Sequence, residues 1–550
     1  MVGVAGKSKG CTTCRKRKIG CDQQKPVCAR CTRSKRVCGG YEKERVFVLV
    51  QPAAGPGGKT HTFLTPGPGP AVSLQGIATA ITTKNKELEL ELEPHPFTET
   101  SVAYTIMHRR IECHNLVQAF LLNCFPSYHD HHSSSSSSPS SHSWIPLLSS
   151  LPTKVEALTI SSAAVAASAL GHMFHDRTLV KQSLKYYTRG LHQLQRALRD
   201  PSLMRDDGTL AACMALSLYE ALECPDSGAA GYFSHCRGLI ALVQARGSEG
   251  HWGGAGLSLF RGVRVPGILF ALNHHTPTIL SSPTWLNQPW TAAGIPKTPQ
   301  DRVTDCLAQA PMILTRVRSL PQLNPPQQVE LIHELIRECW QIDTQLDVIY
   351  TEMRRDALVA DVDADAGGGL LYWRVPSSSS SSSSPSSSQP DSDPFYPDHL
   401  NHPMFPVVFH FRNPQVAATL LLLWATRTMV RSGLCNLYEY LKEGIAPIEG
   451  SSSSSVSEGM GISHSDSDPR NNRCAEYLSP AHRVCQSVEY FLRDKMLLGG
   501  VLSVSPALGI VVDSLRNRAG HGHGREIEWL EGALEGVRRR GLSALRYVDL

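Results

Sequence analysis

The stretch that decides the fold of the N-terminal part runs from Cys11 to Cys38: C-T-T-C-R-K-R-K-I-G-C-D-Q-Q-K-P-V-C-A-R-C-T-R-S-K-R-V-C. It holds six of the sixteen cysteines, as two copies of C-x-x-C-x6-C. Two tetrahedral zinc ions need eight ligand positions, and six thiolates supply eight if two of them bridge. The two bridging thiolates are predicted to be the first cysteines of the two copies, Cys11 and Cys28. The other ligands are then Cys14 and Cys21 for one ion, and Cys31 and Cys38 for the other.

Metal is also needed for this head to fold, because few apolar side chains lie between the cysteines. Ile19, Val27 and Val37 are the main ones. Segments below about 40 residues usually need metal or disulfides to fold, and zinc binding to such peptides contributes on the order of 10 to 16 kcal/mol. We therefore expect the metal-free head to be unfolded.

The charge of the chain is unevenly distributed. Residues 1–45 hold thirteen Lys or Arg against three acidic residues, a balance of +10; since the whole chain carries +5, the remainder totals −5. Within the head, Arg15, Lys16, Arg17 and Lys18 follow the first C-x-x-C on the exposed face of a short predicted helix. Such a polycation binds phosphates through counterion release, which predicts double-stranded DNA as a partner.

No signal peptide or membrane span is expected. Met1–Gly10 is too short and too polar for a signal peptide. The longest nearly uncharged apolar run, around Val416–Thr426, falls short of the roughly 18 to 20 residues that span a bilayer. We expect an intracellular protein without a membrane partner, in which closely spaced thiols are metal ligands rather than disulfides.

At this point the residues resemble a known family. Six cysteines, the basic run at 15–18 and Lys25-Pro26 before Cys28 are in register with the fungal binuclear zinc cluster transcription factors, over Cys11 to about Phe47. The resemblance implies a first helix in the major groove that reads a guanine-containing triplet, usually CGG. Lys18 and Arg17 would then contact base edges, with Arg15 and Lys16 near phosphates. Gly20 departs from the family, where many members have a basic residue.

The basic run and the cysteines of the head also have other interpretations. A basic run alone is often a solvated face or a nuclear-import signal, and cysteine-rich segments also form Fe–S sites, RING or LIM domains. The cysteine spacings of those sites differ from the x2-x6-x6-x2-x6 pattern found here. The DNA-binding zinc cluster is therefore the favoured interpretation.

Residues 51–100 are predicted to be a flexible linker. Pro and Gly dominate through Pro70, and the segment Glu87–Glu93 reads E-L-E-L-E-L-E. Such acidic-apolar alternation occurs in activation segments and is also compatible with an edge strand or a short helix. No sustained heptad repeat appears before residue 100, so a coiled coil after the cluster is not expected. Monomeric DNA binding and a homodimer through the helical domain both stay open.

Residues 101–550 are predicted to form a large all-α domain. In 178–199, apolar residues recur at three- and four-residue spacing, on one helix face: Leu184, Tyr187, Leu191, Leu194 and Leu198. Thr178 is the expected cap, and Asp200-Pro201 the expected end. Similar spacing predicts further helices near 101–124, 153–174, 209–223, 230–246, 302–318, 327–353, 414–431, 478–496 and 525–546.

Three Ser-rich stretches interrupt this domain, at 133–143, 377–393 and 450–468. Their composition cannot build a core, so we expect disordered surface insertions between helices. The fold class is thus mainly α: a zinc cluster in residues 1–50, a flexible linker in 51–100 with an acidic segment, and a helical regulatory domain in 101–550.

The helical part also resembles a family region. Helix 178–199, then Leu210–Leu222, then Y-F-S-H-C-R-G-L-I-A-L-V-Q-A-R-G at 232–247 is similar to the fungal-specific transcription factor domain of the second type, most strongly over 155–250. The resemblance implies that the helical part of the chain is a regulatory domain.

Three stretches resemble enzyme motifs, but each lacks a residue or a structural context that the motif requires. Gly55–Thr60 lacks the first glycine of a P-loop, since residue 53 is Ala. His333-Glu334 begins like a zincin helix but has Arg337 where the second ligand belongs. Gly6–Gly10 fits G-x-S-x-G without the strand and helix that a nucleophile elbow needs.

Scattered His and Cys residues outside the head are not expected to form sites. The histidines 129, 131, 132, 521 and 523 lie in Ser- or Gly-rich sequence and are expected at a flexible surface. Single cysteines such as Cys213 and Cys339 are expected in the core.

The predicted function is a nuclear, sequence-specific DNA-binding transcription factor, not an enzyme, that regulates RNA polymerase II genes and carries two zinc ions. Its partners are DNA and the transcription machinery or co-regulators. One alternative is a ligand-sensing or enzymatic helical domain that carries a zinc module. The other is an interaction scaffold with a basic nuclear-import head.

Overall fold

The computed structural model describes two parts of the chain. In the head it describes residues 13–14, 17, 19, 21–22, 28–34 and 38. Beyond it, the described residues are 99–125, 144–152, 154–223, 230–249, 252–360, 370–377, 404–443, 476–493, 496–518 and 522–539. The predicted linker up to residue 98 and almost all of the three Ser-rich stretches lie outside these ranges.

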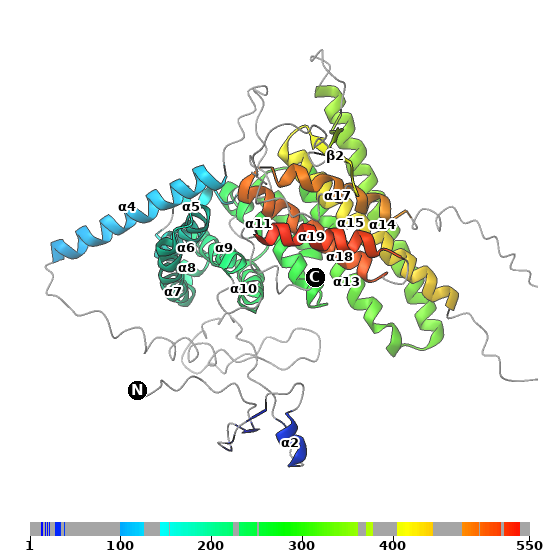
Figure 1. The fold of residues 1–550 in the computed structure, drawn as a ribbon, viewed down its shortest axis with the longest axis horizontal. Coiled ribbons are helices and arrows are strands. Elements are labelled where there is room, and N and C mark those ends of the chain that lie inside the picture. Colours follow the sequence, from blue (N-terminus) through cyan, green and yellow to red (C-terminus); the bar gives the residue numbers. More distant parts are fainter. Residues whose placement is uncertain are drawn as a thin grey trace, which may run out of the picture.

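The described chain is mainly α-helical, as predicted, and Figure 1 shows the helices in sequence colours. The helices of the first half are α2 (Ala29–Arg33), α4 (Glu99–Cys124), α5 (Leu147–Ser150), α6 (Glu156–Met173), α7 (Arg177–Arg199), α8 (Pro201–Met204), α9 (Asp207–Glu223), α10 (Ala230–Arg246) and α11 (Gly254–Asn273). Those of the second half are α12 (Pro283–Ala293), α13 (Pro299–Ser319), α14 (Pro325–Ala360), α15 (Pro414–Glu443), α17 (Leu478–Phe491), α18 (Leu497–Arg516) and α19 (Gly524–Arg539), with 3-10 turns η2 (Ile279–Ser281) and η3 (Leu320–Gln322).

Helix α7 follows its sequence pattern with two corrections. Its N-cap is Asp176, not Thr178, and the Asp176 carboxylate accepts the N–H groups of Thr178 and Leu179. Tyr187 and Leu194 are buried as predicted, whereas Leu184 is about half exposed. The helix ends at Arg199, where Asp200 begins α8 by accepting the N–H of Ser202.

Helix α6 is the centre of the first helical group. It contacts α4, α7 and α9, and its middle is a fully buried run, Ala163 to Ala167, of four alanines around Val165. Small side chains let neighbouring helices approach closely. At the contact with α7, a Cβ on Gly190 would lie 2.8 Å from Oγ of Ser161, so a larger residue would force Ser161 to shift.

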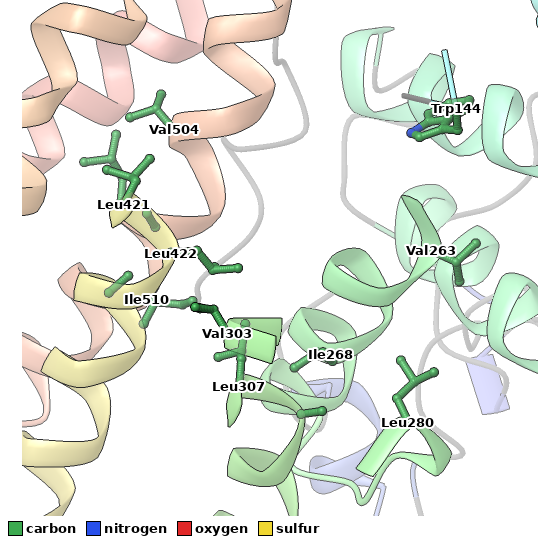
Figure 2. Close-up of a cluster of buried hydrophobic side chains, with 14 of the residues drawn as sticks. Trp144, Val263, Ile268, Leu280, Val303, Leu307, Leu421, Leu422, Val504 and Ile510 are labelled. Carbon is green, nitrogen blue, oxygen red and sulfur yellow. The ribbon is translucent and has the colours of Figure 1, made fainter. Parts of the chain in front are cut away.

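Helix α15 is the centre of a second helical group, in which it contacts α13, α14, α17 and α18. Figure 2 shows how the core continues from there: Val303 and Leu307 of α13 lie between Leu422 of α15 and Ile268 of α11. These side chains belong to one hydrophobic cluster that runs through both groups.

Two helices are long and apolar enough to cross a membrane by length and composition alone, namely α11 and α18. The apolar stretch of α11 is 50% buried inside the protein and that of α18 67%. Since α18 packs on α15, α17 and α19, its apolar residues are accounted for as core.

A two-stranded antiparallel ribbon, which the sequence did not predict, joins α14 to α15. Strand β1 (Tyr372–Pro376) pairs with β2 (Val407–Phe411), with Tyr372 opposite Phe411. The ribbon packs its aromatic face on Trp424 of α15.

The Ser-rich stretches fall between elements. They lie between α4 and α5, between β1 and β2, and between α15 and α17. One boundary needs correction: Ser377, the first residue of the second stretch, is buried. Its N–H donates to the carbonyl of Pro406 at 2.9 Å and its hydroxyl to Glu489 at 2.7 Å.

Candidate metal centre and nucleic-acid interface

Residues 13 and 14, at the end of the first C-x-x-C, are helical, as the sequence predicts. The N–H of Arg17 donates to the carbonyl of Thr13 at 3.2 Å, and that of Ile19 to the carbonyl of Cys14 at 3.1 Å. Cys14 is buried and Arg17 is exposed. The turn therefore directs a sulfur inward and a cation outward.

The second C-x-x-C repeats this arrangement in α2. Cys28 is the N-cap residue, and its sulfur accepts the N–H of Cys31 at 3.3 Å. Both sulfurs are fully buried, while Arg30 and Arg33 are exposed on the helix. In the folded head, the backbone N–H of Cys31 thus fixes the position of the Cys28 sulfur at the start of the helix.

The sulfurs of the two halves converge. Sγ of Cys14 lies 3.7 Å from that of Cys28 and 3.9 Å from that of Cys31. Sulfurs bound to one tetrahedral zinc, with Zn–S near 2.3 Å, are separated by about 3.8 Å. Cys14, Cys28 and Cys31 therefore fit three ligand positions of one zinc ion.

A second group shares one of these residues. The ligand atoms of Cys21, Asp22 and Cys28 lie within 4.8 Å of one another. Cys28 thus belongs to both groups, as a bridging thiolate requires. The structure differs from the predicted allotment on one point, because it brings together Cys14 and Cys31, which were assigned to different ions. Cys11 lies outside the described residues, and Cys38 is half-buried.

Asp22 is the residue of this centre that the sequence reasoning missed. Its carboxylate accepts the N–H of Ala29 at 2.8 Å and that of Arg30 at 3.4 Å, at the start of α2. Burial acts to raise the pKa of Asp22, but hydrogen bonds from these amides, its own N–H and the Cys28 side chain outweigh it and lower the pKa. The sequence signal that could have identified Asp22 is its position as an acidic residue directly after the third cysteine, Cys21.

Of the predicted DNA-contacting residues, Arg17 is described and is exposed. Arg15, Lys16 and Lys18 lie outside the described residues. The exposed cations of α2, Arg30 and Arg33, are placed on the second half, so each half presents positive charge next to its buried sulfurs.

Residues weighed for catalysis have structural partners. On α14, Glu334 and Glu338 both pair with Arg316 at 2.5 Å, so the zincin-like pattern is part of an ion-pair network. Cys213 and Cys339 are buried in the core, as predicted. His523 is not at a flexible surface: it is buried, 2.5 Å from the hydroxyl of Tyr477.

Comparison with known proteins matches two domains. Residues 9–45 match the fungal Zn(2)-Cys(6) binuclear cluster domain, and residues 123–260 match a fungal specific transcription factor domain. The first is a cluster that binds two zinc ions through six cysteines. The second runs from the end of α4 into α11. Both are domains of transcription factors, which are not enzymes.

Individual relatives agree with this assignment. An uncharacterized protein of Emericella nidulans, AN5342, is 25% identical over 198 residues, which cover 34% of this chain and 42% of that protein. An uncharacterized transcriptional regulatory protein of Schizosaccharomyces pombe, C15D4.02, is 62% identical over 32 residues, 6% of each chain. White-opaque regulator 2 of Candida albicans is 61% identical over 33 residues, 6% of this chain and 7% of that protein.

The matches cover less than half of each of these relatives, and no solved structure matches the chain significantly. The chain is a protein of the class that joins a zinc-binding cysteine cluster to a helical domain. More specifically, residues 9–45 and 123–260 carry the two domains of fungal binuclear zinc cluster transcription factors.

Proposed function

We propose that this protein is a nuclear DNA-binding transcription factor that regulates RNA polymerase II genes by reading CGG-like sites through its zinc cluster. The observation that carries this proposal is the convergence of buried Cys14, Cys28 and Cys31 sulfurs beneath exposed Arg17. The two matched domains support it.

Within this proposal, residues 1–50 form the DNA-binding domain, 51–100 the linker and 101–550 the regulatory domain. The metal ligands are Cys11, Cys14, Cys21, Cys28, Cys31 and Cys38. Bound zinc would supply the folding free energy that so small a core lacks.

The chain's own residues would perform the recognition. Lys18 and Arg17 would donate to guanine O6 and N7, a contact that discriminates a base pair by about 1 to 3 kcal/mol. Arg15 and Lys16 would contact phosphates and fix the register of the head on the duplex. Because phosphate contacts release counterions, affinity should fall steeply with salt.

The experiment is a binding titration of the full chain with labelled duplexes. One duplex contains CGG and the other has the same bases scrambled, at one fixed salt concentration. The proposal expects tighter binding to the CGG duplex, and loss of that preference after zinc is removed with a chelator and its recovery when zinc is returned. Equal affinity for both duplexes in zinc would reject the proposal and favour a head that serves only nuclear import.

A further inference from the structure

Strand β1 has an outer edge whose backbone groups bond to no residue that the structure describes. The N–H of Arg412 donates to the carbonyl of Leu371, and that of Ser377 to the carbonyl of Pro406. With the strand register, these bonds show that the backbone N–H and C=O groups of the odd-numbered residues of β1 point toward β2. Because backbone groups alternate in direction along a strand, those of Tyr372 and Arg374 point away from β2. Within the described ranges, no residue forms a backbone hydrogen bond with them.

The opposite edge of the ribbon is covered. Helix α17 packs on β2, and Nε2 of Gln486 donates to the carbonyl of Val407 at 3.0 Å. Val407 is one of the β2 residues whose backbone faces away from β1. The ribbon can therefore gain a strand at β1 but not at β2.

The two faces beside this edge differ in chemistry. Trp373 is 43% exposed and lies with His410 on the face away from the core. Arg374 is exposed and shares the other face with Tyr372. On that face α14 contacts Tyr372 through Tyr350, and exposed Arg354 follows one turn later. An added strand would have an apolar neighbour on one face and two cations on the other.

The chain contains a sequence that matches both faces. In Glu87–Glu93, four glutamates alternate with three leucines, and as a strand it would place all leucines on one face and all glutamates on the other. The leucines would lie beside Trp373, and the glutamates beside Arg374 and Arg354. We propose that Glu87–Glu93 of a second copy of this chain adds to β1 as a third strand.

A second copy is required because the chain's own segment cannot reach. The five residues between Glu93 and α4 span at most about 18 Å. Helix α4 is 26 residues long, about 39 Å, and Figure 1 shows it extending from the body with its first residues at the end opposite the ribbon. The occupant of the β1 edge is therefore assigned to a second copy of the chain.

This inference concerns self-association and does not depend on the proposed DNA recognition. Main-chain hydrogen bonds would provide affinity, and the alternating side chains would select the acidic-apolar segment. It also gives the chain a route to pairing that needs no coiled coil.

The test uses a fluorescent synthetic peptide of residues 84–96 and the full chain with Leu88→Ser, Leu90→Ser and Leu92→Ser, so that its own segment does not compete. We expect saturable binding by fluorescence anisotropy. Arg374→Glu should weaken it at least about tenfold, since it replaces an attraction by a repulsion. The matched control is Arg177→Glu, an exposed arginine of α7, which should leave the affinity unchanged.

Strand addition has a signature that general charge attraction lacks. Two peptides are made, one N-methylated on the leucine amides and one on the alternate glutamate amides. Since only one set of amides faces β1, one peptide should lose binding and the other retain it. The proposal is overturned if the unmodified peptide does not bind, if both methylated peptides bind equally, or if Arg374→Glu binds as tightly as Arg177→Glu.

Discussion

The carboxylate of Asp343 on α14 accepts two hydrogen bonds from Arg431 on α15, from Nε and from Nη2, each at 3.1 Å, and both side chains are buried. The two residues are 88 positions apart in sequence. The ribbon and its 30-residue intervening chain lie between them in sequence, so this ion pair connects the two long helices on either side of the ribbon.

Removing one partner of this pair should destabilise the body strongly. Asp343→Ala leaves the Arg431 guanidinium buried without its carboxylate, which we expect to cost about 3 to 5 kcal/mol. Urea denaturation followed by circular dichroism measures the loss. The control is Asp356→Ala, which removes an exposed pair with Arg355 at 3.4 Å and should change stability by less than about 1 kcal/mol. Equal losses in both variants would contradict the assigned role of Asp343.

Cys28 should be required by both metal sites, because its sulfur belongs to both ligand groups. Cys28→Ala should lower the zinc content of the purified chain from two ions to less than one and abolish DNA binding. Colorimetric zinc release quantifies the first effect. Cys435→Ala, a buried cysteine of α15, should keep both ions; a Cys28→Ala variant that also kept two would show that Cys28 is not shared.

Asp22 should act on the metal through the backbone of α2. Asp22→Ala removes the acceptor for the amides of Ala29 and Arg30, next to the proposed ligands Cys28 and Cys31. Outer-shell partners of this kind usually change metal affinity by about 10- to 100-fold. We expect weaker zinc binding in competition with a chelator at unchanged stoichiometry, and a smaller loss for Asp22→Asn, whose amide oxygen still accepts. Loss of one whole ion would instead make Asp22 a ligand.

Lys18 should determine sequence preference rather than general affinity. Lys18→Ala should relax discrimination at one base pair by about 1 to 3 kcal/mol and leave the fold and zinc content intact. A panel of duplexes with single substitutions in CGG measures this. Arg33→Ala, on the exposed side of α2, should weaken all duplexes alike; the same uniform loss for Lys18→Ala would make Lys18 a phosphate contact.

His235 should make the body less stable in acid. Burial lowers the pKa of His235 to about 4, whereas an unfolded histidine titrates near its ordinary value of about 6.5. The unfolded state therefore binds more protons between these values, so stability falls as pH drops below 6.5 and levels off near 4. The full effect is about 3 kcal/mol.

His235→Gln should remove this part of the pH dependence, since glutamine does not titrate. Urea denaturation at pH 7.5 and pH 5 gives the comparison. His333→Gln, an exposed position of α14, should retain the slope of the unmodified chain. An unchanged slope in His235→Gln would assign the acid sensitivity to other groups.

The sequence predicted most of the structural features that leave a regular pattern, either a period of apolar residues or a fixed spacing of cysteines. Helices with one apolar face, such as α7 and α17, were located because their pattern repeats at 3.6 residues. Helix α18 was missed because Leu497–Arg516 is apolar on nearly all sides, and it contains Gly500 and Pro506. A helix buried on all sides has no polar face to give a period.

Long-range contacts explain the other misses. The ribbon consists of five-residue strands whose paired residues are 31 to 39 positions apart. Strands this short, with partners this distant, give no recognisable sequence pattern. His523 lies among glycines in sequence, but Tyr477, 46 positions earlier, accommodates it in the core. In the head the cysteine spacing predicted a cluster of thiols, and the sulfurs of Cys14, Cys28 and Cys31 do lie together. The hydrogen bonds of Asp22 run to backbone amides, which no spacing rule includes.

The bond between Ser377 and Pro406 has an evolutionary consequence. It pins both ends of the intervening stretch within hydrogen-bond distance, whatever its length. Closing a loop becomes only slightly harder as it grows, by about 0.6 kcal/mol for each doubling. Replication slippage in the serine codons could therefore lengthen or shorten this stretch with little effect on folding, and a fluorescent protein inserted there should leave both flanking helices in place.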